Sequence, residues 1–152
     1  MSTDLPSSAG GLDPGRLWAG GLATAVVAGL IAVAGILVAR GLFDVAVLAP
    51  KGEGLWGNAN TATYALSAGA CALAATALLQ LLAASTPGFG RFFTWIMLLL
   101  TVVATALPLS LDVEQSSMIA TAVINYVIGI AILTILNGVA RSAGHVTRGQ
   151  SR

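Results

Sequence analysis

Few side chains in this sequence have the chemistry to bind or react, and one group of them lies inside apolar runs. It comprises Thr101, Thr105, Asn125 and Tyr126, which form hydrogen bonds without carrying charge. An amide or hydroxyl surrounded by hydrocarbon needs a hydrogen-bond partner, so these residues are expected to join helices to one another. Counting the rise per residue from the ends of the runs puts Asn125 at the depth of Thr105. We predict that these two side chains face each other, with Thr101 and the Tyr126 hydroxyl as alternative partners and ligand contact as an alternative role.

Two further amides occur in apolar runs at a different depth. Gln80 and Asn137 lie at similar depth near the C-terminal ends of their runs, toward the inner face. The same reasoning predicts that they pair with each other.

A second group of polar residues lies at the outer ends of the apolar runs and is charged. It comprises Arg40, Asp44 and Asp112. Arg40 and Asp44 are four residues apart, so they share one face and can pair if the helix continues past the hydrocarbon. One interpretation is a salt-bridged cluster that fastens the long loop to the helices. The other is a binding site for a lipid headgroup or a small polar ligand.

The remaining chemistry is sparse. The chain has one histidine, His145, and one cysteine, Cys71, so neither a metal site nor an internal disulfide is expected. No catalytic constellation, phosphate-binding loop or cofactor motif is present, so we predict no catalytic, metal or cofactor residues. The apolar runs hold no Asp, Glu, Lys, Arg or His. Proton- or ion-coupled carriers generally place such a group at mid-depth, so this class is disfavoured.

The elements that carry these residues are four long apolar runs. They cover residues 17–39, 61–84, 92–111 and 117–139. The chain is 57% hydrophobic and 9% charged, against about 25% charged residues in soluble domains. About 20 apolar residues in a helix cross the hydrocarbon layer of a bilayer. The predicted fold is therefore an all-α membrane protein with four antiparallel transmembrane helices, arranged up-down-up-down.

The predicted domain organisation follows from these runs. Residues 1–15 form a flexible tail, residues 16–140 the transmembrane domain, and residues 141–152 a basic tail. The first run is too long for the apolar part of a signal peptide, so it is expected to be a retained helix. The outer loop, residues 40–60, contains Pro50 and several glycines that are predicted to interrupt regular structure. Val45 and Val47 alternate weakly, which allows a short extended piece.

Small residues recur every three or four positions in the first two runs. They are Gly21, Ala25, Ala28, Ala32, Gly35 and Ala39 in the first, and Ala65, Ala68, Ala72 and Ala75 in the second. Such rows let membrane helices approach closely, so the first two helices are predicted to pack through them. An alanine-rich composition also produces such rows by chance, which remains the alternative.

Charges near the ends of the runs predict the orientation. With the N-terminus inside, the cytoplasmic segments hold Arg16, Arg91, Arg141, Arg148 and Arg152, and the opposite side holds Arg40 and Lys51. Positive residues are enriched in cytoplasmic segments. Five positive residues on one side against two on the other therefore predict that both termini lie in the cytoplasm.

The sequence of the loop and of the residues that follow it resembles that of a protein family. The run VARGLFDVAVLAPKGEG, followed by Trp56 and the start of the second apolar run at residues 58–64, resembles an uncharacterised family of small four-helix membrane proteins. That family is common in high-GC Gram-positive bacteria, and the likeness covers nearly all of the chain after the first fifteen residues. It implies the four-helix architecture and no particular reaction.

Three functions are compatible with these observations. The first is a non-enzymatic accessory, assembly or envelope-associated protein that acts through helix and loop contacts. Its partners are the lipid bilayer and either a membrane protein or a second copy of the chain. The second is a small oligomeric transporter or channel-like protein for an uncharged or lipid-like substrate. The third is a lipid-modifying enzyme that uses Asp44 or Asp112. A net charge of +1 argues against nucleic acid as a partner.

Overall fold

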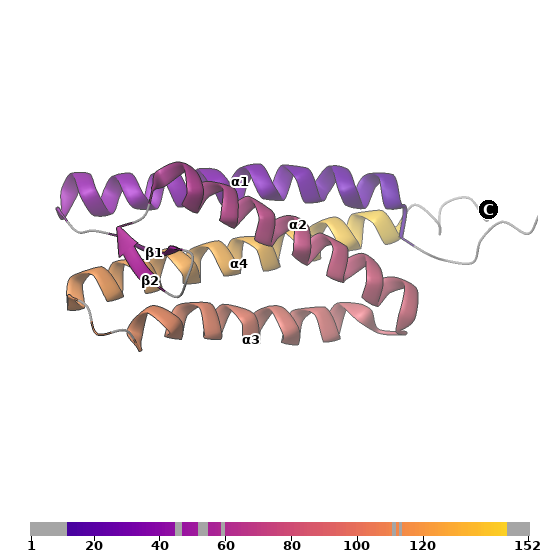
Figure 1. Cartoon of the computed structure of the whole chain (residues 1–152). Helices are drawn as coiled ribbons and strands as arrows, with labels where there is room; N and C mark the ends of the chain where they lie inside the picture. The colour runs from indigo at the N-terminus through magenta and orange to yellow at the C-terminus, as the bar shows by residue number, and fades with distance from the viewer. Residues whose placement is uncertain are drawn as a thin grey trace, which may run out of the picture.

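Long helices dominate the computed structural model, which describes residues 12–44, 47–51, 55–58, 60–110, 112 and 114–145. The elements in chain order are α1 (Pro14–Leu42), β1 (Leu48–Lys51), β2 (Leu55–Asn58), α2 (Thr61–Ser85), α3 (Phe89–Leu109) and α4 (Gln115–His145) (Figure 1). All four helices are long and apolar enough to cross a membrane. The predicted apolar runs fall within or close to them. Most of the two predicted tails lies outside the described residues.

Capping residues explain where the helices begin. The Asp13 carboxylate accepts a hydrogen bond of 3.0 Å from the Gly15 amide, and Pro14 occupies the first helical turn of α1. The Asn60 side chain accepts a bond of 3.1 Å from the Ala62 amide at the start of α2. Gly88 precedes α3 with a φ of 77°, a left-handed conformation that glycine adopts without steric cost.

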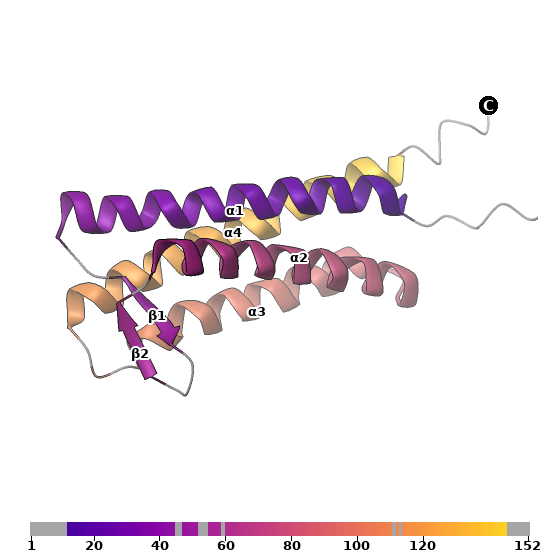
Figure 2. The ribbon, with the colours of Figure 1, turned by 45° about the horizontal axis from the view of Figure 1, so that its top comes forward.

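Helices α1 and α2 lie side by side and pack through small residues (Figures 1 and 2). A Cβ atom built on Gly21 would lie 2.5 Å from the Thr76 Cγ2, so only glycine fits there. A Cβ on Gly69 would lie 3.5 Å from the Ala25 carbonyl oxygen. The inner face of the pair also buries Ala28, Ala32, Ala68 and Ala72. The predicted packing through small residues is confirmed.

Helix α1 also contacts α4, through Gly20 next to this row and through Gly35 within it. A Cβ on Gly20 would lie 2.5 Å from the Val139 Cγ1, and one on Gly35 would lie 2.9 Å from the Ile124 Cγ1. Residue numbers rise along α1 while they fall along α4, as they also do along α2 in its contacts with α1. The first helix therefore fits between two neighbours, with glycine where each approach is tightest.

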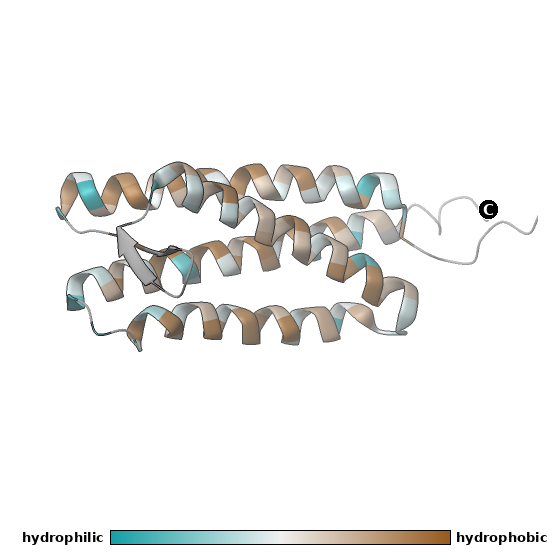
Figure 3. Ribbon diagram, viewed as in Figure 1, coloured by the Kyte–Doolittle hydropathy of each residue, from teal (hydrophilic) through white to brown (hydrophobic). Residues whose placement is uncertain are grey.

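Apolar side chains occupy both the interior and the outside of the helices. The core includes Leu17, Ile36, Leu79, Phe93 and Leu136, all fully buried. Large apolar side chains are also exposed along the outer faces, among them Leu22, Val26, Leu30, Leu66, Leu99 and Val102. Figure 3 shows apolar residues along the whole length of the four helices, with the most hydrophilic residues mainly toward their ends. Helices that are apolar all round are typical of proteins surrounded by lipid.

The 40–60 loop contains a two-stranded antiparallel hairpin, which corrects the prediction that Pro50 would interrupt regular structure. In its register Leu48 is opposite Asn58 and Pro50 is opposite Trp56. Each strand of a two-stranded ribbon has a free edge, where a proline without an N–H is tolerated. The extended piece thus begins at Leu48, whereas the predicted one began at Val45, which lies outside the described residues.

One side of the hairpin is anchored to α4. Val47 is completely buried, and the Leu48 amide donates a hydrogen bond of 3.0 Å to the Thr121 hydroxyl. The Thr121 hydroxyl in turn donates to the Ser117 carbonyl at 2.7 Å. The hairpin therefore lies against the first turns of α4 (Figure 2).

We expect Gly21→Ala to destabilise the chain by about 1–3 kcal/mol, because the new methyl group would overlap the Thr76 side chain. Gly138→Ala is the matched control: no atom lies within 4 Å of a Cβ built there, and alanine favours helix more than glycine does. Its stability should be unchanged or higher. Thermal unfolding in detergent, followed by tryptophan fluorescence, measures both. Equal stability of the two variants would contradict the close α1–α2 packing.

Candidate functional site

The side chain of Asn125 on α4 connects three helices. Its Nδ2 donates a hydrogen bond of 2.7 Å to the Ala104 carbonyl on α3. Its Oδ1 accepts a hydrogen bond from the Tyr64 hydroxyl on α2. Tyr64 is itself buried. We call Tyr64, Asn125 and the Ala104 carbonyl the asparagine node.

The proline in α3 explains why the Ala104 carbonyl is available. In a helix this carbonyl would accept a bond from the amide of the residue four positions later, which here is Pro108. Proline has no N–H and cannot supply it. In apolar surroundings an unpaired carbonyl is costly, and a neighbouring helix often provides the missing donor. The Asn125 amide does this for Ala104.

The node corrects the predicted pairing of Asn125. The predicted depth was right, since Ala104 is next to Thr105, but the partners are a backbone carbonyl and Tyr64. The Thr101 hydroxyl donates to its own helix at the Met97 carbonyl, 2.7 Å away. The Tyr126 side chain is 54% exposed. The carbonyl freed by Pro108 is the signal in the sequence from which a partner for the Asn125 amide could have been predicted.

The predicted pairing of Gln80 with Asn137 is also wrong. The Gln80 Oε1 accepts a hydrogen bond from the Trp18 indole on α1. The Asn137 Nδ2 donates to the Thr94 hydroxyl on α3 at 3.2 Å. The depth of a residue along a helix does not determine the direction in which its side chain points from the helix axis. Similar depth was therefore not sufficient to predict that Gln80 and Asn137 pair.

The charged group lies at the hairpin end of the molecule. Arg40 is in the last turn of α1, Asp44 follows that helix with a φ of 52°, and Asp112 lies between α3 and α4. All three are exposed. Figure 1 shows the end of α1, the end of α3 and the start of α4 at the same end of the molecule. Because α1 ends at Leu42, the helical face predicted to hold both Arg40 and Asp44 stops before Asp44. Their joint action remains a prediction.

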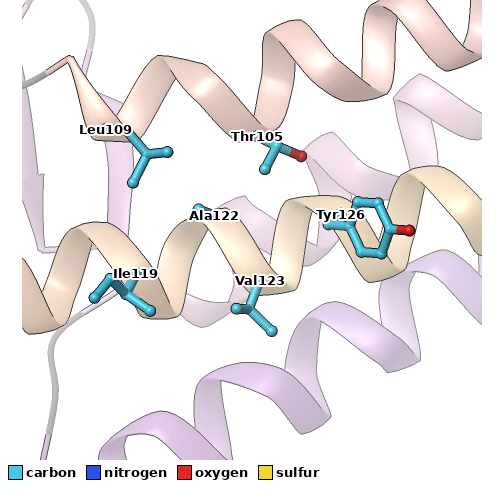
Figure 4. Close-up of a pocket in the computed structure, with 6 residues that line it drawn as sticks. All are labelled: Thr105, Leu109, Ile119, Ala122, Val123 and Tyr126. Atoms are coloured by element: carbon cyan, nitrogen blue, oxygen red, sulfur yellow. The ribbon is translucent and has the colours of Figure 1, made fainter.

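A shallow groove of about 330 Å³ runs between α3 and α4 near the same end. It is lined by Thr105, Leu109, Ile119, Ala122, Val123 and Tyr126 (Figure 4). Two members of the predicted intramembrane cluster, Thr105 and Tyr126, thus share this groove. The other two do not: Asn125 belongs to the node, and Thr101 packs on Gly129. Among the described residues, no group of three or more His, Cys, Asp or Glu side chains could hold a metal ion.

Comparison with protein families matches residues 12–142 to a family of unknown function, DUF6069. The chain belongs to this family. The matched range includes the hairpin and nearly all of the four helices. Comparisons with curated proteins and with solved structures found no match.

We expect Asn125→Leu to destabilise the chain by about 1–2 kcal/mol, since it leaves both the Ala104 carbonyl and the Tyr64 hydroxyl without a partner. The cost should be smaller in a Pro108→Ala background, where the residue 108 amide can bond to Ala104. Unfolding in a denaturing detergent, followed by circular dichroism, gives the four free energies of this double-mutant cycle. An equal cost in both backgrounds would show that Pro108 and Asn125 are not coupled through Ala104.

Proposed function

We propose that the chain is a multi-pass protein of the cytoplasmic membrane whose four helices cross it in alternating directions, up-down-up-down. The order of the helix contacts supports this arrangement, because Gly21 meets Thr76 while Ala25 meets Gly69. The start of α1 and the end of α4 lie at one end of the molecule (Figure 1). The exposed apolar side chains of all four helices suit a lipid surrounding.

Within this arrangement, the distribution of charge favours cytoplasmic termini. The end that holds the start of α1 and the α2–α3 turn carries Arg16, Arg91 and Arg141. The hairpin end carries Arg40 and Lys51 together with several carboxylates. The positive-inside rule then puts the hairpin outside the cell.

We further propose that the protein is a non-enzymatic accessory or assembly protein that acts by contact. The observation that carries this proposal is the way the helices use their uncharged polar side chains. The asparagine node, the Trp18–Gln80 bond and the Asn137–Thr94 bond each join two or more helices. Buried threonines such as Thr24, Thr76 and Thr101 bond to carbonyls of their own helix. The first set of bonds holds helices together, and the second satisfies buried hydroxyls within single helices.

A transporter for an uncharged or lipid-like substrate is the alternative. It would need a continuous polar path between the helices, to which Thr101, Thr105 and Asn125 were the candidates. Thr101 and Asn125 have partners within the fold, and Thr105 lines a groove on the outside of α3 and α4. This arrangement favours the accessory role.

Cysteine labelling tests the orientation. In a Cys71→Ser background, Leu55→Cys in the hairpin should react with a membrane-impermeant maleimide on intact cells. Ser142→Cys near the end of α4 should react only after the membrane is permeabilised. Neither substitution changes the charges that the positive-inside rule counts. The reverse labelling pattern would overturn the proposed orientation.

Two measurements together test the accessory role. After mild extraction from its native membrane, the chain at its natural expression level should run in native mass spectrometry as a complex of fixed stoichiometry with another membrane protein. Purified chain in proteoliposomes should leave the permeability to glycerol and urea at the level of protein-free vesicles. A raised permeability would favour the transporter, and a chain that is always monomeric would contradict the accessory role.

A further inference from the structure

The contact between α3 and α4 changes along its length, from tight to open. Near the middle, a Cβ on Gly129 would lie 2.5 Å from the Thr101 Cγ2, so no side chain would fit at position 129. One turn further, Asn125 is bonded to the Ala104 carbonyl. Beyond that bond the groove begins, with the small residues Ala122 and Thr105 on its walls (Figure 4). The asparagine node therefore marks the inner end of the groove.

Thr105, one of the residues that line the groove, has a buried hydroxyl that does not face it. Six threonines in the helices donate a hydrogen bond to the carbonyl four residues earlier: Thr24, Thr76, Thr94, Thr101, Thr121 and Thr134. The Thr105 Oγ1 is buried and has no hydrogen-bond partner among the described residues. Threonine in a helix populates more than one χ1 rotamer, and a turn of about 120° about χ1 places the hydroxyl where the methyl group was. Rotation about χ1 would thus turn this hydroxyl toward the groove without moving the helix.

We propose that the α3–α4 groove binds one acyl chain of an ester-linked glycerolipid, whose ester carbonyl accepts a hydrogen bond from the Thr105 hydroxyl. The inference rests on the proposal that α3 and α4 cross the membrane. A defined lipid site goes beyond the accessory role, which requires only contacts with a protein partner.

The lining and the position of the groove favour a lipid chain as the occupant. Its residues include no charged side chain, and Leu109, Ile119 and Val123 are each about half exposed, so it opens sideways onto the outer face of the helices. In a bilayer that face is in contact with acyl chains. A volume of about 330 Å³ is at the small end of ligand sites, which suits part of one chain. An ester carbonyl is an acceptor that lacks a donor of its own and matches the unpaired hydroxyl.

Filling the groove tests the site. Purified chain in dodecyl maltoside is titrated with dioleoylphosphatidylcholine, and bound lipid is counted by native mass spectrometry. Val123→Trp, inside the groove, should weaken binding of the first lipid at least tenfold. Val127→Trp is the matched control: it starts from an exposed valine on the same helix outside the groove and should stay within twofold of the wild type. Unchanged binding by Val123→Trp would overturn the site.

The hydroxyl is tested with a pair of lipids. The dialkyl ether analogue of the same lipid has the same chains and headgroup but no ester carbonyl. Thr105→Val should weaken binding of the ester lipid about fivefold, the worth of one neutral hydrogen bond, and leave the ether lipid unchanged. Thr134→Val, an exposed threonine bonded to its own helix, should change neither. An equal effect on both lipids, or none on either, would overturn the proposed bond.

Two controls separate this proposal from others. If Val123→Trp instead dissociates a dimer of the wild-type chain, the groove is covered by a second copy and the lipid proposal fails. If the wild-type chain is released from membranes by alkaline carbonate, the membrane proposal itself has failed. Thermal unfolding of each variant shows that a loss of binding is not a loss of fold.

Discussion

In the membrane that we propose for this protein, the absence of water around each helix is the constraint on which the rest of the structure depends. Each backbone carbonyl in hydrocarbon needs a donor, and in a regular helix the chain provides it. Pro108 breaks that rule for Ala104, and the Asn125 amide restores it from a neighbouring helix. The Tyr64 hydroxyl donates to the oxygen of the same amide, so α2, α3 and α4 are joined where Pro108 lacks an N–H.

Small residues decide how closely the helices approach elsewhere. Between surfaces that are all apolar, lipid competes equally well with protein, so helix association depends on close packing and on hydrogen bonds. Gly21 and Gly129 permit contacts that a single methyl group would prevent. Where the small residues Ala122 and Thr105 line the interface without such an approach, a groove remains. Small side chains therefore allow a tight contact at Gly129 and leave an open groove at Ala122 and Thr105.

The hairpin shows how the longest connection is held. Its strands pair with each other, and the buried Val47 and the bond from Leu48 to Thr121 fix one side of it to α4. The same end of the molecule carries Arg40, Asp44 and Asp112, all exposed. The exposed charged residues at this end thus lie near a short ordered hairpin and the ends of three helices, with the lipid groove that we propose close by.

Hydropathy and end residues were enough to locate the helices, because a run of about 20 uncharged apolar residues has few alternatives to a membrane helix. The rows of small residues correctly indicated the α1–α2 contact, and counting the helical rise correctly placed Asn125 at the level of residues 104 and 105. The partners of Asn125, Gln80 and Asn137 were decided only in three dimensions. They depend on how each helix is rotated about its own axis, and that rotation is set by the packing of all four helices at once. The hairpin was missed for a similar reason, since its anchor on Thr121 lies 73 residues away in the chain.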